Sequence, residues 1–222
     1  MESSPKIIEL YGLPGCGKTT LCNRLHEKYP KTTIDVELIW DGQKLYRKIL
    51  EIPFWILVKL CWLFIISPKL PRKEWNIYIG FLVHLGAYSY IKKTKYKYLL
   101  SDNGLVQDMV SLFYKKESSF SKKHLKAFYN IAKEYDNSFQ IFCDIPVNMS
   151  LERIRKRNRN KGRLDLISND KMLAESLTTQ SDFFNKMNEV LQCMGVKYLV
   201  LNMNDSVDNL ADKVTSEMSF GK

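Results

Sequence analysis

The residues with the clearest chemical meaning lie in the segment Gly12-Leu13-Pro14-Gly15-Cys16-Gly17-Lys18-Thr19, which has the spacing GxxxxGK[ST]. In this pattern the glycines let successive backbone N–H groups surround phosphate oxygens, the lysine reaches the β and γ oxygens, and the hydroxyl can ligate Mg²⁺. A plain glycine turn before a helix is the alternative, but it does not require the Lys-Thr pair at this spacing. The segment therefore predicts binding of a nucleoside triphosphate with Mg²⁺, through Gly12, Pro14, Gly15, Cys16, Gly17, Lys18, Thr19 and Thr20.

Apolar segments that alternate with helical segments are expected to position this loop. Residues 6–11 form an apolar run before the loop, and residues 18–29 carry apolar side chains at helical spacing after it. Further strands are expected at residues 33–37, 96–101, 139–144 and 197–201. This order predicts an α/β fold with a three-layer, doubly wound sheet of five parallel strands, in a single domain over residues 1–222.

Acidic residues at the ends of these strands are candidate partners of the phosphates and the metal, because ligands of parallel sheets bind at the carboxyl ends of the strands. Asp102 ends an apolar strand, and we expect it to hold Mg²⁺ together with Thr19. Its alternative role is that of a cap or turn residue before the next helix. Other acids at this edge are Asp35 and Glu37 after the second strand and Asp144 after the fourth.

The segment 153–163 carries seven positive side chains in eleven residues. Arg153 and Arg157 are four residues apart and share one face of the predicted helix. In a phosphate-loop enzyme such arginines, placed in a short lid, can close over the γ-phosphate, and this predicts a lid at residues 153–166 with Arg163 as a further phosphate ligand. A nucleic-acid or membrane patch and a solvated helix face are the alternatives.

These motifs resemble the nucleotide-kinase branch of the phosphate-loop proteins, above all the thymidylate-kinase-like group. The resemblance rests on the phosphate loop, the strand that ends in Asp102, the segment Cys143-Asp144-Ile145-Pro146-Val147 with the basic residues 151–157 after it, and the closing segment 195–202. It covers residues 1–40 and 96–220. It implies ATP as the phosphoryl donor and a nucleoside- or nucleotide-kinase-like fold with an arginine-rich lid.

The resemblance also implies that a carboxylate after the second strand orients the acceptor. The segment Asp35-Val36-Glu37-Leu38-Ile39-Trp40 is faintly similar to the Glu-Pro-Val-x-x-Trp of deoxynucleoside kinases, with Asp35 in the place of the acid, and Glu37 remains the alternative. The candidate catalytic residues are Lys18, Asp35 or Glu37, Asp102, Arg153 and Arg157.

The chain departs from the thymidylate-kinase pattern directly after Asp102. The family has Asp-Arg-aromatic there, with the arginine on the phosphate of the acceptor, whereas this chain has Asp102-Asn103-Gly104. We therefore expect a neutral hydroxyl compound (a sugar, a polyol or a lipid-linked alcohol) as acceptor, bound by Asn103 or Gln107. A thymidylate-kinase-like nucleotide kinase and a membrane-associated regulatory NTPase are the alternatives.

Residues 43–95 form a hydrophobic insertion in the expected acceptor-binding region. Residues 49–66 hold 15 apolar residues among 18, and a second apolar and aromatic run follows at 75–91. A membrane span is not expected, because Lys59 interrupts the first run and a span would divide the nucleotide-binding fold. A buried or dimerising helical pair and a hairpin that docks on a membrane or receives an apolar acceptor both remain open.

Composition sets wider bounds. The chain has 222 residues and a net charge of +10, which favours anionic ligands without requiring nucleic acid, a partner that we do not expect. Its five cysteines lack any CxxC spacing and its three histidines lack metal-ligand spacing, so reduced thiols in a cytoplasmic protein are expected. The first residues do not resemble a signal peptide. Peripheral contact with the inner face of a membrane remains open.

Overall fold

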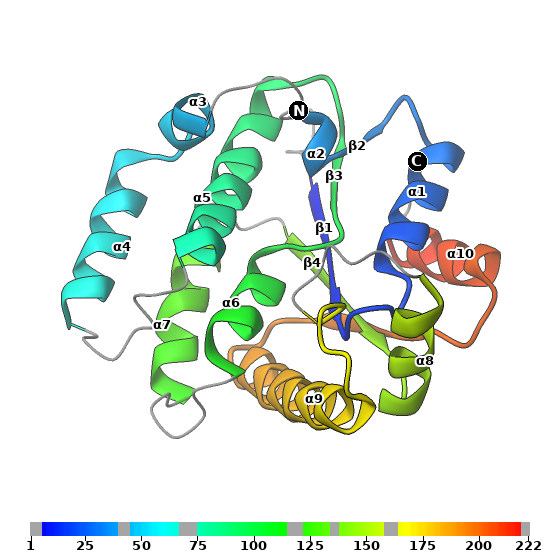
Figure 1. Cartoon of the computed structure of the whole chain (residues 1–222). Coiled ribbons are helices and arrows are strands. Elements are labelled where there is room, and N and C mark those ends of the chain that lie inside the picture. The colour runs from blue at the N-terminus through cyan, green and yellow to red at the C-terminus, as the bar shows by residue number, and fades with distance from the viewer. Residues whose placement is uncertain are drawn as a thin grey trace.

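The protein is described from a computed structural model, which covers residues 6–39, 45–66, 75–114, 122–133, 138–157 and 164–218. Five parallel strands form one sheet in the order β2-β3-β1-β4-β5 (Figure 1). Their bounds are β1 Lys6–Gly12, β2 Thr33–Asp35, β3 Tyr98–Ser101, β4 Ser138–Asp144 and β5 Tyr198–Asn202. The predicted α/β class with a five-stranded parallel sheet is confirmed.

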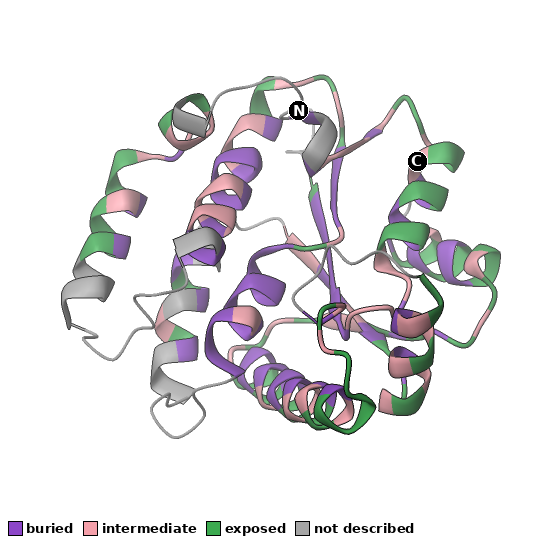
Figure 2. Cartoon of the chain, in the orientation of Figure 1, coloured by how far each residue is buried: buried purple, intermediate pink, exposed green. Residues whose placement is uncertain are grey.

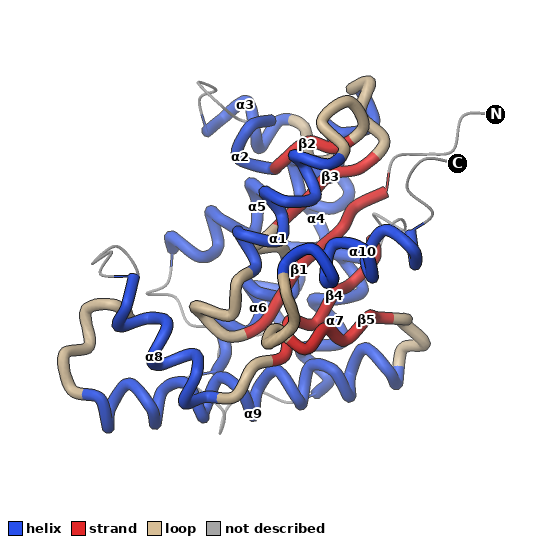
Figure 3. Tube along the Cα trace, turned by 90° about the vertical axis from the view of Figure 1, so that its right-hand side faces the viewer, coloured by secondary structure: helices blue, strands red, loops and turns tan. Residues whose placement is uncertain are grey.

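Helices cover both faces of this sheet, which gives the three layers (Figures 1 and 3). Helices α1 (Lys18–Lys28) and α10 (Val207–Met218) pack together on one face. The opposite face is covered by α6 (Leu105–Phe113), α7 (Lys122–Lys133) and α9 (Asp170–Cys193), while α8 (Val147–Arg157) packs against α9. The buried core lies between these layers and includes Ile8, Leu10, Leu21, Val110, Phe184 and Val214.

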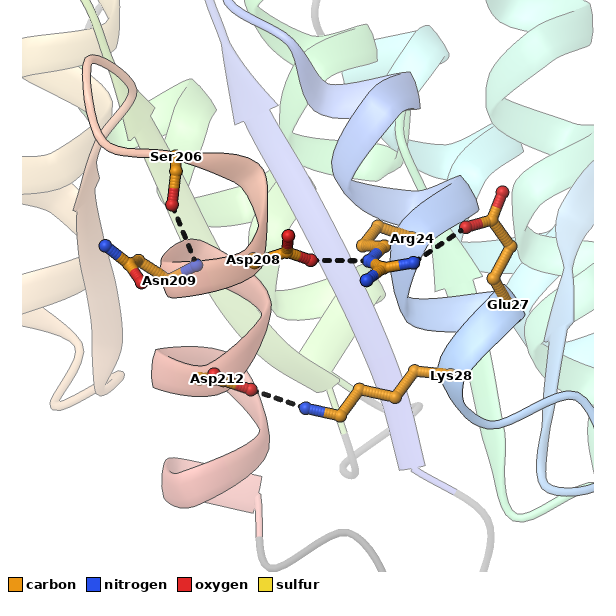
Figure 4. Close-up of polar contacts among 7 residues, drawn as sticks. All are labelled: Arg24, Glu27, Lys28, Ser206, Asp208, Asn209 and Asp212. Carbon is orange, nitrogen blue, oxygen red and sulfur yellow. Dashed lines mark hydrogen bonds and ion pairs between the residues drawn. The ribbon is translucent and has the colours of Figure 1, made fainter.

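Two ion pairs join α1 to α10 across the surface (Figure 4). Arg24 Nε donates to Asp208 Oδ1 at 2.6 Å, and Lys28 pairs with Asp212 one turn further along. All four side chains are exposed, and pairs of this kind contribute only about 0–1 kcal/mol each. The packing of the two helices therefore rests mainly on their buried apolar residues.

The second strand is shorter than predicted. It ends at Asp35, and residues Val36–Ile39 form the short helix α2, where the buried side chains of Val36 and Ile39 lie three residues apart. This helical spacing places both apolar side chains on one face, which outweighs continuation of the strand. Glu37 consequently lies in a helix, and its side chain falls outside the described part of the structure.

The hydrophobic insertion forms helices α3 (Leu45–Leu50), α4 (Phe54–Ile66) and α5 (Trp75–Tyr90), followed by a short 3₁₀ turn, Ile91–Lys93. Helix α5 is largely buried and packs against α3 and α6, whereas α4 lies at the periphery against α7 (Figure 2). Within the described ranges, none of the helices is long and apolar enough to cross a membrane.

A buried ion pair joins α5 to α6. His84 Nδ1 lies 2.7 Å from Asp108 Oδ2, and both side chains are nearly excluded from solvent. Burial lowers the pKa of His84, but the attraction and hydrogen bond of Asp108, with a smaller effect of Glu9, raise it above its ordinary value. Burial also raises the pKa of Asp108, and His84 opposes this change. The pair therefore fixes α5 against α6 most strongly when His84 is protonated and Asp108 is ionised.

We expect the stability that His84 supplies to fall as the pH rises. Because the pKa of His84 is raised in the folded chain, its stabilising protonation is complete below the unfolded value and is lost as the pH passes the folded value. The free energy of unfolding of the wild type, measured with urea, should exceed that of His84→Gln by roughly 3 kcal/mol near pH 6. The difference should be clearly smaller near pH 9. Asp108→Asn should remove most of this pH dependence. A difference that stays constant over this range would contradict the assignment.

Candidate active site

The phosphate loop begins at Gly12, where β1 ends beside β4. Gly12 is paired in register with Cys143 and has a φ of 148°. A Cβ atom at Gly12 would lie 2.4 Å from the carbonyl oxygen of Cys143, so no side chain fits there. The chain then turns back, with the N–H of Cys16 donating to the carbonyl of Leu13 at 3.2 Å, and enters α1 at Lys18. The loop thus joins strand and helix as the sequence predicts.

Helix α8 holds this loop from the side. Ser150 Oγ donates to the carbonyl of Pro14 at 2.6 Å. Arg153 Nη1 donates to the carbonyl of Cys16 at 3.0 Å, and its Nη2 donates to the carbonyl of Met203 at 3.1 Å. Arg153, predicted as a lid residue, therefore lies at the loop and links it to the segment between β5 and α10. Nothing in the sequence alone indicated these two carbonyl partners.

The two predicted metal ligands lie in contact. Thr19 Oγ1, in the first turn of α1, donates to Asp102 Oδ2 directly after β3. A hydroxyl and a carboxylate oxygen at one point suit Mg²⁺, which prefers oxygen ligands and is commonly completed by phosphate oxygens and water. Among the described residues there is no cluster of three or more His, Cys, Asp or Glu that could hold a metal ion by itself. Thr19 and Asp102 therefore have the chemistry expected of a Mg²⁺ site, and their role as its ligands stays a prediction.

The ammonium group of Lys18 lies over the start of the phosphate loop. Its Nζ donates to the carbonyls of Gly12 at 3.0 Å and Leu13 at 3.2 Å, and lies 3.6 Å from Cys16 Sγ. Burial opposes ionisation of Cys16, but the neighbouring Cys143 thiol and the positive charge of Lys18 together lower the pKa of the Cys16 thiol. The positive charge of Lys18 therefore lies beside the loop, and its contact with a phosphate group stays a prediction.

The predicted acceptor-side residues are less closely grouped. Asp35 is paired in register with Leu100 of β3, and Leu100 lies two residues before Asp102. Asn103, the residue after Asp102, is exposed. Gln107 is buried, and its Oε1 accepts the N–H of Gly12 at 3.0 Å. This contact ties α6 to the phosphate loop, a role for Gln107 that the sequence did not predict. Its role toward an acceptor stays a prediction.

The basic side chains at the end of α8 have partners within the protein. Arg157 Nη2 lies 2.6 Å from the buried carboxylate of Asp165, and Arg155 pairs with Asp170 at 2.7 Å. Although Arg153 and Arg157 are four residues apart, the first turns to the phosphate loop and the second to Asp165. Residues 158–163 of the predicted lid, including Arg163, lie outside the described residues.

The sequence analysis missed one buried acid beneath the loop, Glu9. It lies in the middle of β1 with only 1% of its surface exposed, and its carboxylate accepts hydrogen bonds from Tyr88, Gln140 and the N–H of Val106. Burial raises the pKa of Glu9, while the three donors oppose this rise. The available signal was a single acid in an otherwise apolar strand, Lys6-Ile7-Ile8-Glu9-Leu10-Tyr11.

Comparison of the fold with solved structures finds similar chains among the kinases. Deoxyadenosine kinase from M. mycoides with bound dATP aligns over 96% of this chain and 99% of its own, with a TM-score of 0.51 and 12% identity. The same enzyme with dCMP and dCDP bound aligns over 96% and 98%, with the same TM-score and 15% identity. Shikimate kinase from Acinetobacter baumannii aligns with a TM-score of 0.48 and 17% identity.

No protein-family model matches this chain, and no curated protein matches it in sequence. The similarity to deoxyadenosine kinase, at 12–15% identity, concerns the fold alone. The chain therefore has the fold of the phosphate-loop nucleoside and nucleotide kinases, with a five-stranded parallel sheet in the order 2-3-1-4-5.

We predict that Arg153 acts on nucleotide affinity by holding the loop. Arg153→Met leaves the carbonyls of Cys16 and Met203 without this donor, so the affinity for Mg·ATP should fall about tenfold and the melting temperature should drop. Calorimetric titration and thermal unfolding would measure both effects. Arg155→Met, which removes a surface ion pair, is the matched control and should change neither. Normal affinity with slower ATP turnover would instead identify Arg153 as a ligand of the transferring phosphoryl group.

Proposed function

We propose that the protein is an ATP- and Mg²⁺-dependent phosphotransferase that acts on a small-molecule acceptor. The observation that carries the proposal is the contact between Thr19 and Asp102 at the end of a phosphate loop whose Lys18 lies within hydrogen-bonding reach of the same loop. Phosphoryl transfer depends mainly on alignment and charge stabilisation, and these groups can supply both on the donor side. The kinase-like fold agrees with this chemistry.

Each residue has a separate role in this proposal. Lys18 stabilises the charge on the phosphoryl group, and the loop N–H groups orient the phosphates. Thr19 and Asp102 would hold Mg²⁺, which neutralises charge between the β and γ oxygens when it is bound. Arg157 can add positive charge if its guanidinium exchanges Asp165 for phosphate oxygens. Asp35, or Glu37 in α2, orients the acceptor hydroxyl and accepts its proton.

On the acceptor side we propose a neutral hydroxyl compound, such as a sugar, a polyol or a lipid-linked alcohol. Asn103 stands where the thymidylate-kinase-like pattern has an arginine, and a neutral amide cannot balance the charge of an acceptor phosphate. Nucleosides also belong in this class, because a similar fold occurs in a deoxyadenosine kinase. A nucleoside monophosphate is the alternative acceptor, and a regulatory NTPase without an acceptor is the alternative function.

The test is an ADP-release screen over nucleosides, nucleotides, sugars, polyols and prenyl alcohols. We expect one class of hydroxyl compound to stimulate ADP release in the presence of Mg²⁺. Lys18→Ala should lower the stimulated rate by at least about 100-fold without a change in melting temperature, because it removes a charge that acts on the transferring group. Lys31→Ala, at an exposed position after α1, is the matched control. Slow hydrolysis that no compound stimulates would support the regulatory function and contradict the kinase proposal.

A second proposal concerns the outer face of α3 and α4, defined by Leu50, Phe54, Trp55, Val58 and Cys61. These side chains are exposed, with 77% of the surface of Phe54 and 59% of that of Trp55 accessible. Helix α4 already places Ile56 and Leu60 in the core, so it is apolar on both faces. Exposed apolar groups of this density indicate a binding surface.

We assign this outer face to an anionic membrane surface. The exposed cations Arg47, Lys59 and Lys93 lie on or beside it, and Lys93 contacts Glu51 between the two helices. Apolar and aromatic groups flanked by cations suit the interface of an anionic bilayer. A dimer through the same face is the alternative, and the test below separates the two. Docking here would also bring the protein to a lipid-linked acceptor.

Liposome co-sedimentation tests this assignment. We expect binding to vesicles of phosphatidylglycerol and phosphatidylcholine, weaker binding to phosphatidylcholine alone, and loss of binding in Phe54→Glu/Val58→Glu. Val200→Glu, at an exposed apolar residue of the edge strand β5, is the control and should bind normally. Absence of binding by the wild type, or a concentration-dependent dimer that Phe54→Glu/Val58→Glu dissociates, would overturn it.

A further inference from the structure

A row of polar side chains crosses the sheet beneath the phosphate loop. Ser101 of β3 and Gln140 of β4 are both paired in register with Glu9 of β1, and all three residues are buried. Gln140 Nε2 donates to Glu9 Oε2 at 3.2 Å. A buried carboxylate is costly unless several donors surround it. Its presence in the central strand, three residues before the loop, therefore calls for a structural reason.

The first reason lies at the start of α6. The N–H of Val106 belongs to the first turn of this helix, where backbone donors lack partners within the helix. The N-cap residue is Gly104, which has no side chain that could accept such a hydrogen bond. Glu9 Oε1 accepts this N–H and places negative charge at the positive end of the helix. A Cβ atom on Gly104 would lie 2.4 Å from Cδ and Cγ of Glu9. The side chain of Glu9 therefore packs closely against Gly104, two residues after Asp102.

Helix α6 has a second attachment to β1 at the next residue of the helix, Gln107. Gln107 Oε1 accepts the N–H of Gly12, so Glu9 and Gln107 together fix α6 against β1 and the loop at two points. The turn 102–104 lies between β3 and α6, and both of its ends are therefore held. This restricts where Asp102 can lie relative to Thr19.

The same carboxylate also contacts the insertion. Tyr88 of α5 donates its hydroxyl hydrogen to Glu9 Oε2 at 3.0 Å. Four residues earlier on α5, His84 pairs with Asp108 of α6. Helix α5 is thus attached to β1 through Tyr88 and to α6 through His84. Helix α6 follows the turn that carries Asp102, the proposed metal ligand.

We propose that Glu9 is a positioning residue that holds Asp102 at the metal site and, through Tyr88, links helix α5 of the insertion to the donor half of the site. This rests on the proposed binding of Mg·ATP, but not on phosphoryl transfer or on any acceptor. A displacement of α5 is transmitted to Asp102 through the Tyr88–Glu9–Val106 contacts. In this proposal Glu9 acts through Asp102 and does not itself bind the nucleotide or the metal.

The test compares Glu9→Gln with variants that separate position from stability. In Glu9→Gln a single amide oxygen replaces two carboxylate oxygens, so the new NH₂ group faces either the N–H of Val106 or the donors Tyr88 and Gln140. We expect the affinity for ATP in the presence of Mg²⁺ to fall about tenfold, while the affinity for ATP in EDTA changes by less than about twofold. Glu9→Gln/Tyr88→Phe removes one of the conflicting donors and should recover part of the Mg²⁺-dependent affinity.

Tyr11→Phe is the matched control. Tyr11 is buried in the same strand and donates to Asn188 at 2.7 Å, away from α6. It should lower the melting temperature but leave the Mg²⁺ dependence unchanged. Equal effects of Glu9→Gln with and without Mg²⁺, or the same pattern in Tyr11→Phe, overturn the positioning role while Mg·ATP binding stands. If Glu9→Gln does not fold, Tyr88→Phe alone decides, and an unchanged Mg²⁺ dependence there overturns the link to α5. Absence of Mg·ATP binding by the wild type overturns both proposals.

Discussion

The insertion of β3 between β1 and β2 is the constraint on which the candidate site depends. Because the register pairs Glu9 with Ser101, Asp102 follows level with Leu10, two residues before β1 ends in the phosphate loop. Thr19 can reach Asp102 only because these two strands are neighbours. The same sheet places Asp35 level with Leu100. Residues far apart in sequence thus meet at one edge, as expected for the carboxyl ends of parallel strands.

The buried polar groups beneath this edge explain how the arrangement is kept in one geometry. Burial disfavours the ionised carboxylates of Glu9 and Asp108, so an apolar layer would be the simpler solution for stability alone. Apolar contacts are nearly non-directional, however, whereas hydrogen bonds require defined distances and angles. The contacts of Glu9 with Tyr88 and Val106, and of His84 with Asp108, therefore restrict sliding of α5 and α6 past each other.

Sequence reasoning succeeded where the signal is local. The GxxxxGK[ST] spacing and the alternation of apolar strands with helices each depend on neighbouring residues, and the structure has the predicted sheet. It failed where a partner lies far along the chain. The contacts of Arg153 with the carbonyl of Met203, and of Gln107 with Gly12, join segments 50 and 95 residues apart. The predicted strand 33–37 extends past the observed end at Asp35, because Val36 suits a strand and a helix alike.

The donor and acceptor halves of the site differ in what builds them. The proposed donor half uses Lys18, Thr19 and Asp102, whose places are set by the glycine loop and the strand register, so its geometry follows from the fold. The proposed acceptor half depends on individual side chains, and their charges favour one class of substrate over another. Asp35 and Asp102 are acidic and Asn103 is neutral at this edge, so a monophosphate acceptor would add about two negative charges beside two carboxylates. A neutral hydroxyl avoids this repulsion, and a carboxylate near it is then useful as a proton acceptor.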